Sequence, residues 1–375
     1  MRQVLSAALA SLALLSGFGG AHAAEPRVVP AVDGIFAAFK DHPVVGLGDA
    51  HGLAEEGDFY EQLVADPRFA KEVGNVVFEA ASAFHQTTLD RYLAGEDVPR
   101  AEVRRIWSEA IGWGSPPTEM YGRFLAAVRE TNRKLPPRRR IKVWAGEPPA
   151  DWNTIHSADD LEPYLQQRDS YPAGLIRREI LAKGKKALVI YGALHFYPLP
   201  TIPPYPPGVS IKGLVEAARP GAVFVVHPYS GYLQPDCSTS FEAATRWPAG
   251  SLVTPVRSTS LEALLTRPDC PAIRPPRPVP GGPQPSPEAL ARAQAGHVRA
   301  ASGIDADAIL YLGPAASLTR SPDDPDLTRD PAYAQEIRQR LLTMGDSADV
   351  LNHLLTRRVP YRPRPAAPRS AKSTP

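Results

Sequence analysis

The sequence predicts an α/β fold with a mostly parallel central sheet and helices on both faces. Short runs rich in Val and Ile, many ending near glycine, alternate with segments whose apolar residues have helical spacing. Strands buried on both faces read as continuous apolar runs, so these runs indicate parallel strands. Two of them lead into Gly-x-x-His segments that end at His51 and His195. Both histidines are therefore expected at the carboxyl edge of the sheet, where such folds bind ligands.

The first half of the chain alternates helix and strand. A helix is expected at 34–40, a strand at 44–47, a helical run at 59–64 and a β-branched strand at 75–79, which together give a βαβ unit. Pro67 and Gly74 separate the helical run from the second strand. Further helices are expected at 82–94, 97–107, 119–132 and 168–183, and strands at 141–146 and 187–191.

The second half continues the pattern more weakly. A helix at 213–218, strands at 222–227 and 307–313, and a helix at 332–342 are expected, with the last strand in the same sheet. The proline-rich segment 271–287 predicts an extended surface excursion, and the tail 359–375 predicts disorder. The expected organisation is a single α/β domain over 24–358.

Residues 1–23 have the pattern of a secretory signal peptide. Arg2 precedes an apolar stretch at 4–18, and Ala21-His22-Ala23 supplies the small residues of a cleavage site. The apolar stretch is too short to span a membrane, and no later stretch is long and uncharged enough. We expect a soluble periplasmic or secreted protein, without a lipid anchor because no cysteine follows the cleavage site.

Cys237 and Cys270 are the only cysteines. In an oxidising compartment they predict a disulfide that closes a loop of about 34 residues, and two free buried thiols are the alternative.

The charges exclude two classes of partner. Lys and Arg number 42 and Asp and Glu number 40, interspersed, with a net charge of +2. Neither a nucleic-acid partner nor a membrane surface is indicated. The expected partner is a small molecule or a peptide.

Asp49 and His51 are the first candidate site residues. They lie two positions apart, so along a strand both side chains project to the same side. Gly48 and Gly52 would allow a tight turn and close approach of a ligand. The alternative is that Gly48-Asp49 forms a simple turn and His51 lies beside a helix start.

Other candidates also end apolar runs. Glu79 is predicted to be a site carboxylate, or else to cap the following helix near Ser82. His195 is predicted to be a site histidine, or else a core histidine. His227 ends a strand with no polar residue before it, and a structural role is expected.

Arg168 could hold a carboxylate ligand or orient Glu79, since its guanidinium offers a planar, permanently charged fork. A solvent-exposed helix cation is the alternative. Glu147 and Asp151, near Trp152, could line a pocket or lie in a surface loop.

Several familiar sites are missing from the sequence. We find no Gly-x-Ser-x-Gly elbow, no phosphate-binding Gly-rich loop, no His-Glu-x-x-His and no cysteine cluster. The remaining histidines and carboxylates suit general-base activation of water or a divalent metal.

These motifs resemble the superfamily that joins erythromycin esterases, ChaN-type haem-uptake proteins and the Tiki/TraB proteins. The resemblance covers about 44–197 and rests on Gly48-Asp49-Ala50-His51-Gly52, Val77-Phe78-Glu79, Arg168-Asp169 and Gly192-Ala193-Leu194-His195. His51, Glu79 and His195 match the superfamily's motifs. Asp49 stands where the usual Gly-Glu-x-His motif has glutamate, and it is shorter by one methylene.

The resemblance implies an EreA/ChaN-like α/β fold with its site at the carboxyl edge of the sheet. In the esterase branch a histidine matching His51 activates water without a metal. In the Tiki branch the matching residues, here Asp49, His51, Glu79 and His195, hold a divalent metal for peptide hydrolysis. The ChaN branch binds haem, although this chain lacks a lipid-anchor cysteine.

The sequence thus favours a hydrolase that cleaves an ester or amide. His51 would be the general base, Asp49 and Glu79 would orient it or bind a cation, and His195 with Arg168 would stabilise the oxyanion. The alternative is a periplasmic protein that binds haem, iron or another small ligand. Its pocket would be lined by Trp144, Trp152, Tyr191 and Tyr197. An inactive relative of either is the third possibility.

Overall fold

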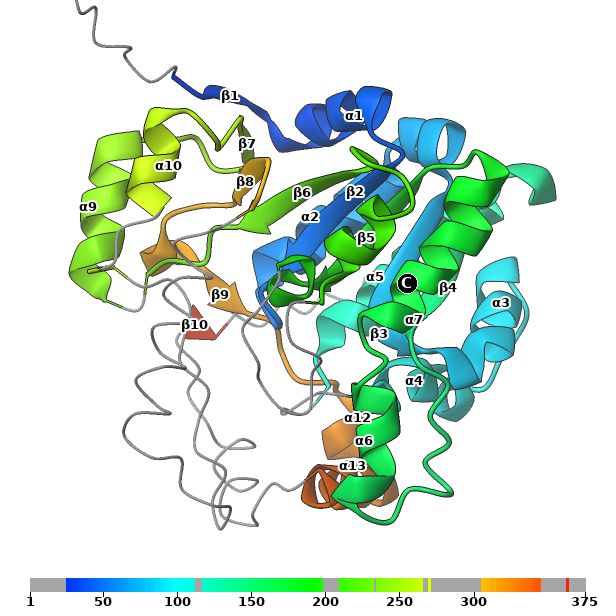
Figure 1. The fold of residues 1–375 in the computed structure, drawn as a ribbon. Helices are drawn as coiled ribbons and strands as arrows, with labels where there is room; N and C mark the ends of the chain where they lie inside the picture. The colour runs from blue at the N-terminus through cyan, green and yellow to red at the C-terminus, as the bar shows by residue number, and fades with distance from the viewer. Residues whose placement is uncertain are drawn as a thin grey trace, which may run out of the picture.

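The computed structural model describes residues 25–111, 117–197, 209–232, 234–265, 269–270 and 305–344, and the backbone of Arg362–Pro363 (Figure 1). The predicted signal peptide and proline-rich excursion lie outside the described residues. So does the predicted tail apart from β10 (Arg362–Pro363), which pairs in parallel with β9 (Thr319–Arg320).

Eight strands form one sheet in the order β1-β7-β8-β6-β2-β5-β3-β4. The strands from β8 to β4 run parallel, whereas β7 pairs antiparallel with both β1 and β8. This arrangement confirms the predicted α/β class. The bounds are β1 (Arg27–Pro30), β2 (Val44–Asp49), β3 (Asn75–Ser82), β4 (Lys142–Glu147), β5 (Ala187–Gly192), β6 (Val223–Pro228), β7 (Ser251–Thr254) and β8 (Ala308–Tyr311).

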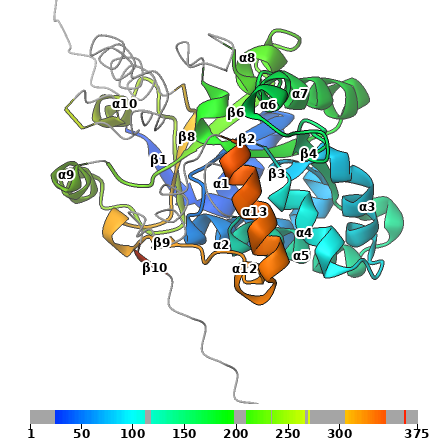
Figure 2. The ribbon, with the colours of Figure 1, turned by 90° about the horizontal axis from the view of Figure 1, so that it is seen from below.

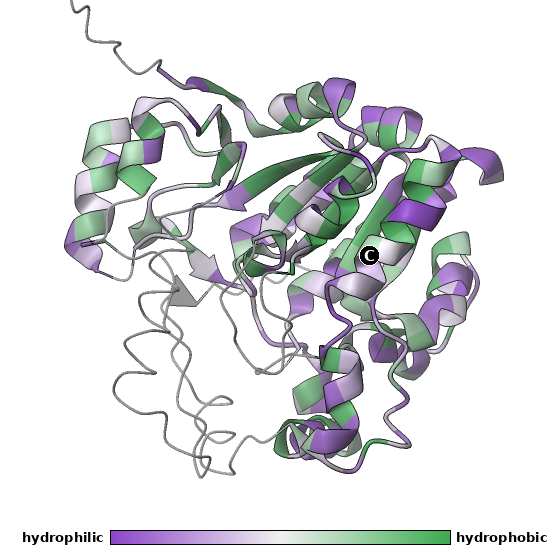
Figure 3. Ribbon diagram, viewed as in Figure 1, coloured by the Kyte–Doolittle hydropathy of each residue, from purple (hydrophilic) through white to green (hydrophobic). Residues whose placement is uncertain are grey.

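Helices cover both faces of the sheet (Figure 2). Because neighbouring strand residues point to opposite faces, Leu188 and Ile190 of β5 pack in one core cluster, and Val189 and Tyr191 pack in the other. The strands are correspondingly hydrophobic, and the helices carry the polar residues (Figure 3). The first cluster includes residues of α1 (Ala31–Asp41), α2 (Ala54–Ala65), α3 (Gln86–Ala94), α4 (Arg100–Ser108) and α5 (Glu119–Arg133), and the second includes residues of α7 (Ser170–Leu175) and α8 (Ile211–Glu216).

The C-terminal helices α12 (Asp326–Arg329) and α13 (Pro331–Thr343) dock against α4. Arg340 of α13 donates to the Ser108 carbonyl at 3.1 Å and to Glu109 at 2.7 Å. The segment before them reaches the end of β2, where the Ser321 amide donates to the Gly52 carbonyl at 2.8 Å. In Figure 2 α13 crosses in front of the sheet.

Two expected elements differ from the structure. β3 continues past Glu79 to Ser82 because these residues stay buried and Ser82 pairs with Glu147, so α3 begins only at Gln86. The register shifts between Phe78 and Ser82, and Glu79 lies within this irregular part of the strand rather than at its end. The helix expected at 168–183 is also shorter and irregular, since a π-helical turn, Ile176–Ile180, follows α7. Arg168 therefore precedes the helix.

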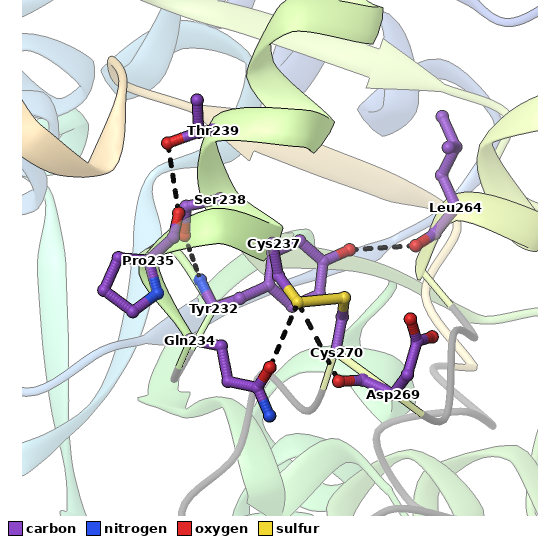
Figure 4. Close-up of a disulfide and its surroundings, with 9 residues drawn as sticks. All are labelled: Tyr232, Gln234, Pro235, Cys237, Ser238, Thr239, Leu264, Asp269 and Cys270. Carbon is purple, nitrogen blue, oxygen red and sulfur yellow. Dashed lines mark hydrogen bonds between the residues drawn. A yellow bond between two sulfur atoms is a disulfide. The ribbon is translucent and has the colours of Figure 1, made fainter.

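The structure joins Cys237 and Cys270 in a disulfide with a Cα–Cα distance of 5.6 Å, so the alternative of free thiols is wrong (Figure 4). The bond links α9 (Pro235–Thr245) to the segment after α10 (Ser260–Leu265). Nearby, Tyr232 donates its backbone amide to Ser238 and its hydroxyl to the Leu264 carbonyl. No helix within the described ranges is long and apolar enough to cross a membrane.

We expect the paired substitution Cys237→Ser and Cys270→Ser to lower the free energy of unfolding by about 3 to 4 kcal/mol, because the unfolded chain loses a cross-link that closes a loop of about 34 residues. Urea unfolding under oxidising conditions measures this loss. Reduction of the wild type should reproduce it and should leave the double variant unchanged. Equal midpoints for the oxidised wild type and the variant would contradict the prediction.

Candidate functional site

Asp49 and His51 form a compact unit at the carboxyl end of β2. The His51 backbone amide donates to Asp49 Oδ1 at 2.8 Å, and the His51 ring atom Nδ1 lies 3.2 Å from Asp49 Oδ2. The Asp49 side chain is buried, whereas 44% of the His51 side chain is exposed. With a carboxylate at Nδ1, the favoured neutral tautomer has its proton there and the basic lone pair on Nε2.

The backbone of His51 has φ of +51°, a left-handed conformation that few non-glycine residues adopt. This turn folds the histidine back onto Asp49, so that its backbone amide and its ring atom Nδ1 both reach the Asp49 carboxylate. Such a conformation costs free energy, which the two contacts with Asp49 help to offset.

Tyr121, from α5, completes the surroundings of Asp49. Its hydroxyl donates to Asp49 Oδ2 at 2.9 Å and lies 3.5 Å from His51 Nδ1. Burial and the charges of Asp49 and Glu79 raise the pKa of Tyr121 well above its usual value of about 10, so the hydroxyl keeps its proton. The sequence analysis missed this residue, because an aromatic on the buried face of a helix reads as ordinary core.

Gly192, the last residue of β5, lies next to both Glu79 and His51. Its amide donates to Glu79 Oε2 at 2.5 Å. A Cβ atom at this position would lie 2.6 Å from His51 Nε2 and 3.4 Å from Glu79 Oε2. The basic nitrogen of His51 and the carboxylate of Glu79 therefore converge on the same point of the backbone.

Arg168 links Glu79 to Glu147 inside the protein. Its Nη2 atom binds Glu79 Oε1 and lies 2.6 Å from Glu147 Oε1, and its Nε donates to the same Glu147 oxygen at 2.8 Å. All three side chains are almost fully buried. These contacts show that Arg168 is not a solvent-exposed helix cation, and they place Glu147 beside the site rather than in a surface loop.

Burial affects the two glutamates differently. It favours the protonated form of Glu79, but the charges and hydrogen bonds of His195, His51 and Arg168 outweigh it and hold the pKa of Glu79 well below its usual range. For Glu147 burial dominates over the attraction of Arg168 and raises the pKa to about 7. Glu79 is thus the anion of the pair at neutral pH.

His195 lies between two carboxylates. Its Nδ1 is 2.7 Å from Asp169 Oδ1 and its Nε2 is 3.4 Å from Glu79 Oε1. Burial and the charge of Arg168 oppose protonation of the ring, but these two carboxylates raise its pKa to about 10. His195 is therefore an imidazolium at neutral pH, and 13% of its side chain is exposed.

The structure brings together all five predicted catalytic residues: Asp49, His51, Glu79, Arg168 and His195. It places Asp151 elsewhere, in an exposed turn with Asn153. His227 is paired with the Tyr197 hydroxyl at 2.9 Å, and burial lowers its pKa to about 4, in keeping with the structural role expected for it.

The contacts of Glu79 and His195 do not suit a metal-ligand set. Both Glu79 oxygens accept from N–H donors, one from the Arg168 guanidinium and one from the Gly192 amide. Within the described ranges no three His, Cys, Asp or Glu side chains are grouped as they would be around a metal ion. This set of donors suits hydrogen bonding rather than coordination.

Of the aromatic residues expected around a haem, Tyr191 lies beside His195, with the two ring centroids 5.5 Å apart, and the other three have different neighbours. Tyr191 and Tyr197 are fully buried, with only 0% and 2% of their surfaces exposed, so neither presents a ring face to a ligand. Trp152 donates to the Glu109 carbonyl, and Trp144 donates to Asn75. These four side chains do not form a common pocket wall for a haem.

Comparisons with known proteins add little to this geometry. No family model matches the chain, and no curated protein matches it. Among solved structures, the type III effector HopBA1 is similar at 15% identity and a TM-score of 0.34, over 57% of this chain and 90% of that one. A Bacillus cereus protein matches at 12% identity and 0.34, over 56% and 73%. ChaN of Campylobacter jejuni, described with cofacial haem binding, matches at 10% identity and 0.31, over 56% and 93%. Likenesses at this level leave family and function open.

The left-handed backbone of His51 gives a stability prediction. We expect His51→Gly to be more stable than His51→Ala by about 1 kcal/mol, because both lose the imidazole but only glycine relieves the positive φ. Thermal or urea unfolding of the two variants at one pH measures the difference. His42→Gly against His42→Ala is the control, since His42 is extended. A less stable glycine variant at position 51 would contradict the prediction.

Proposed function

We propose that this protein is an exported hydrolase that cleaves an ester or amide of a small molecule or peptide, with His51 as general base. The observation that carries the proposal is the pair of hydrogen bonds by which Asp49 holds both the backbone and the ring of His51. They fix Nδ1 as the protonated atom and aim the basic Nε2 toward Gly192 and Glu79.

In the proposed reaction, Nε2 of His51 removes a proton from a water molecule as the water oxygen adds to the carbonyl carbon. The carbonyl electron pair moves to its oxygen and gives a tetrahedral oxyanion. Collapse of that intermediate breaks the bond to the leaving oxygen or nitrogen, which takes the proton back from His51. Asp49 stabilises the imidazolium that exists between the two transfers.

The cationic His195 ring supplies a positive charge close to Glu79 and is a candidate to stabilise the oxyanion. Arg168 has a different part in the proposal. Its guanidinium is held between Glu79 and Glu147, so it keeps Glu79 ionised and in place rather than meeting the substrate. Glu79 in turn holds the Gly192 backbone against His51.

Export is proposed from two features that agree. Residues 1–23 have the composition of a signal peptide, and Cys237 and Cys270 form a disulfide, which persists in oxidising compartments.

The central test is hydrolysis of a panel of p-nitrophenyl esters and aminoacyl p-nitroanilides by the purified mature protein. We expect His51→Ala to lower kcat/KM by about 100-fold to 10,000-fold, since the general base is lost. His42→Ala is the matched control, because His42 precedes β2 at the opposite end of the strand. Unchanged turnover in His51→Ala would overturn the proposal.

Two further arms of that experiment separate the alternatives. Turnover that is lost with a chelator, together with a stoichiometric metal absent from a His51→Ala, His195→Ala double variant, would replace water activation by His51 with a metal mechanism. A Soret band on haem titration that disappears in the same variant would make ligand binding the function. We expect neither.

The pH profile provides an independent check. Burial lowers the pKa of His51, but the Asp49 charge and hydrogen bond, with the Glu79 charge, outweigh it and raise the pKa above 6.5. Because the base must be deprotonated, kcat/KM should rise with pH through a midpoint above 6.5. Asp49→Asn removes the main cause of the increase, so its midpoint should move to lower pH and its plateau should fall. A midpoint that does not change in Asp49→Asn would show that the titration of His51 does not cause the rise of kcat/KM with pH.

A further inference from the structure

A second carboxyl group lies behind Asp49 in the core. Glu56, in the first turn of α2, is completely buried, and its Oε2 accepts the Ala50 backbone amide at 2.8 Å. Its side chain is also within hydrogen-bonding contact of the Asp49 side chain. No Lys or Arg in the described ranges forms an ion pair with Glu56. The groups that face it are Asp49 from β2 and Tyr60 from α2. Tyr121 of α5, which donates to Asp49, is also close to Glu56.

Two buried oxygen atoms in this cluster have no hydrogen-bond partner among the described residues: Glu56 Oε1 and the Tyr60 hydroxyl. Two ionised carboxylates side by side can offer only acceptors to each other, and a buried charge without a counter-ion is costly. One proton placed between the two carboxyl groups removes both difficulties, because it neutralises one charge and supplies a donor.

The hydrogen bonds indicate which carboxyl group takes the proton. Asp49 accepts from the His51 amide, from the His51 ring and from the Tyr121 hydroxyl, and each of these donors favours its ionised form. Glu56 accepts from the Ala50 backbone amide, and the Tyr60 hydroxyl beside it also faces Asp49. The proton therefore belongs on Glu56, next to an ionised Asp49.

We propose that Glu56 is protonated in the folded protein and donates a hydrogen bond to Asp49, which makes it a positioning residue for His51. The inference rests on the proposed function in that it treats Asp49 and His51 as the general-base unit. Burial and the neighbouring Asp49 charge raise the pKa of Glu56 well above its usual range, in agreement with the geometry. Glu56 and Tyr121 then both donate to Asp49 and hold its carboxylate against the imidazole.

The test is the titration of His51, followed by NMR in the free protein. Glu56→Gln keeps the shape of the side chain and supplies an amide donor for Asp49 and an acceptor for Ala50. We expect the His51 midpoint to change by less than about 0.3 pH units, because no charge is removed. If Glu56 were ionised, the same substitution would remove a negative charge near His51, and the midpoint would fall by about one unit. That fall would overturn the proposal.

The pH dependence of stability gives a second readout. A carboxyl group with a raised pKa in the folded state stabilises the protein below the unfolded pKa of about 4.3, and this stabilisation is lost as pH rises toward the folded pKa. Glutamine does not titrate, so the melting temperature of Glu56→Gln minus that of the wild type should increase from pH 5 to pH 8. Glu55→Gln is the matched control, since Glu55 binds Thr319 and does not face Asp49. Parallel curves for the Glu56 variant and the wild type would overturn the proposal.

The carboxyl group can also be observed in the wild type, which removes any dependence on folding of a variant. In protein labelled with 13C at glutamate carboxyl groups, the signal of Glu56 should keep its protonated shift at pH 6, in addition to that of Glu147, whose pKa is about 7. Fewer than two protonated glutamate signals at pH 6 would contradict the proposal. None of these readouts requires turnover. A protein without hydrolase activity that still shows them would refute the proposed function and leave the Glu56 to Asp49 hydrogen bond in place.

Discussion

The ion pair between Glu79 and Arg168 is the interaction on which the rest of the site depends. Glu79 comes from the irregular part of β3, and its second oxygen holds the Gly192 amide at the end of β5. Arg168 reaches it from the segment before α7 and also binds Glu147 at the end of β4. Neither charge meets solvent, so each is tolerated only because the other is present. The pair thereby links three neighbouring strands, β3, β4 and β5, and His51 lies against the Gly192 backbone that Glu79 holds.

Charge balance explains why some carboxyl groups in this region carry protons. Five buried or nearly buried acids surround the site, and in the part of the chain that the structure describes Arg168, His195 and a partly protonated His51 are the cations that oppose them. The acids are Asp49, Glu56, Glu79, Glu147 and Asp169. Glu79 and Asp169 flank the imidazolium of His195, and Asp49 has three hydrogen-bond donors. The groups that most readily hold a proton are therefore Glu147, whose pKa burial raises to about 7 despite Arg168, and Glu56, which has no cation among its described neighbours.

Much of the fold and of the predicted site follows from the sequence, because buried parallel strands are recognisable as apolar runs and their carboxyl ends meet at one edge. This logic is sufficient to bring Asp49, Glu79 and His195 together, but it fails where local pattern is weak. β1 and β7 are four-residue strands that pair antiparallel, too short for periodicity to reveal. Tyr121 and Glu56 lie on the buried faces of helices, where the spacing predicts core packing and says nothing of a polar partner. The positive φ of His51 also leaves no mark in composition.

The arrangement around Asp49 argues for proton transfer more than for ligand binding alone. A histidine that merely contacts a ligand needs an accessible ring, which half-exposed His51 has without help. Here, in addition, a strained backbone turns the ring toward a buried carboxylate, and Tyr121 fixes that carboxylate from α5. Contacts of this kind are set before any substrate arrives, so no reorganisation is needed when the imidazolium forms. Such preorganisation has a cost in backbone strain and in buried charge, and the general-base chemistry proposed for Nε2 would account for that cost.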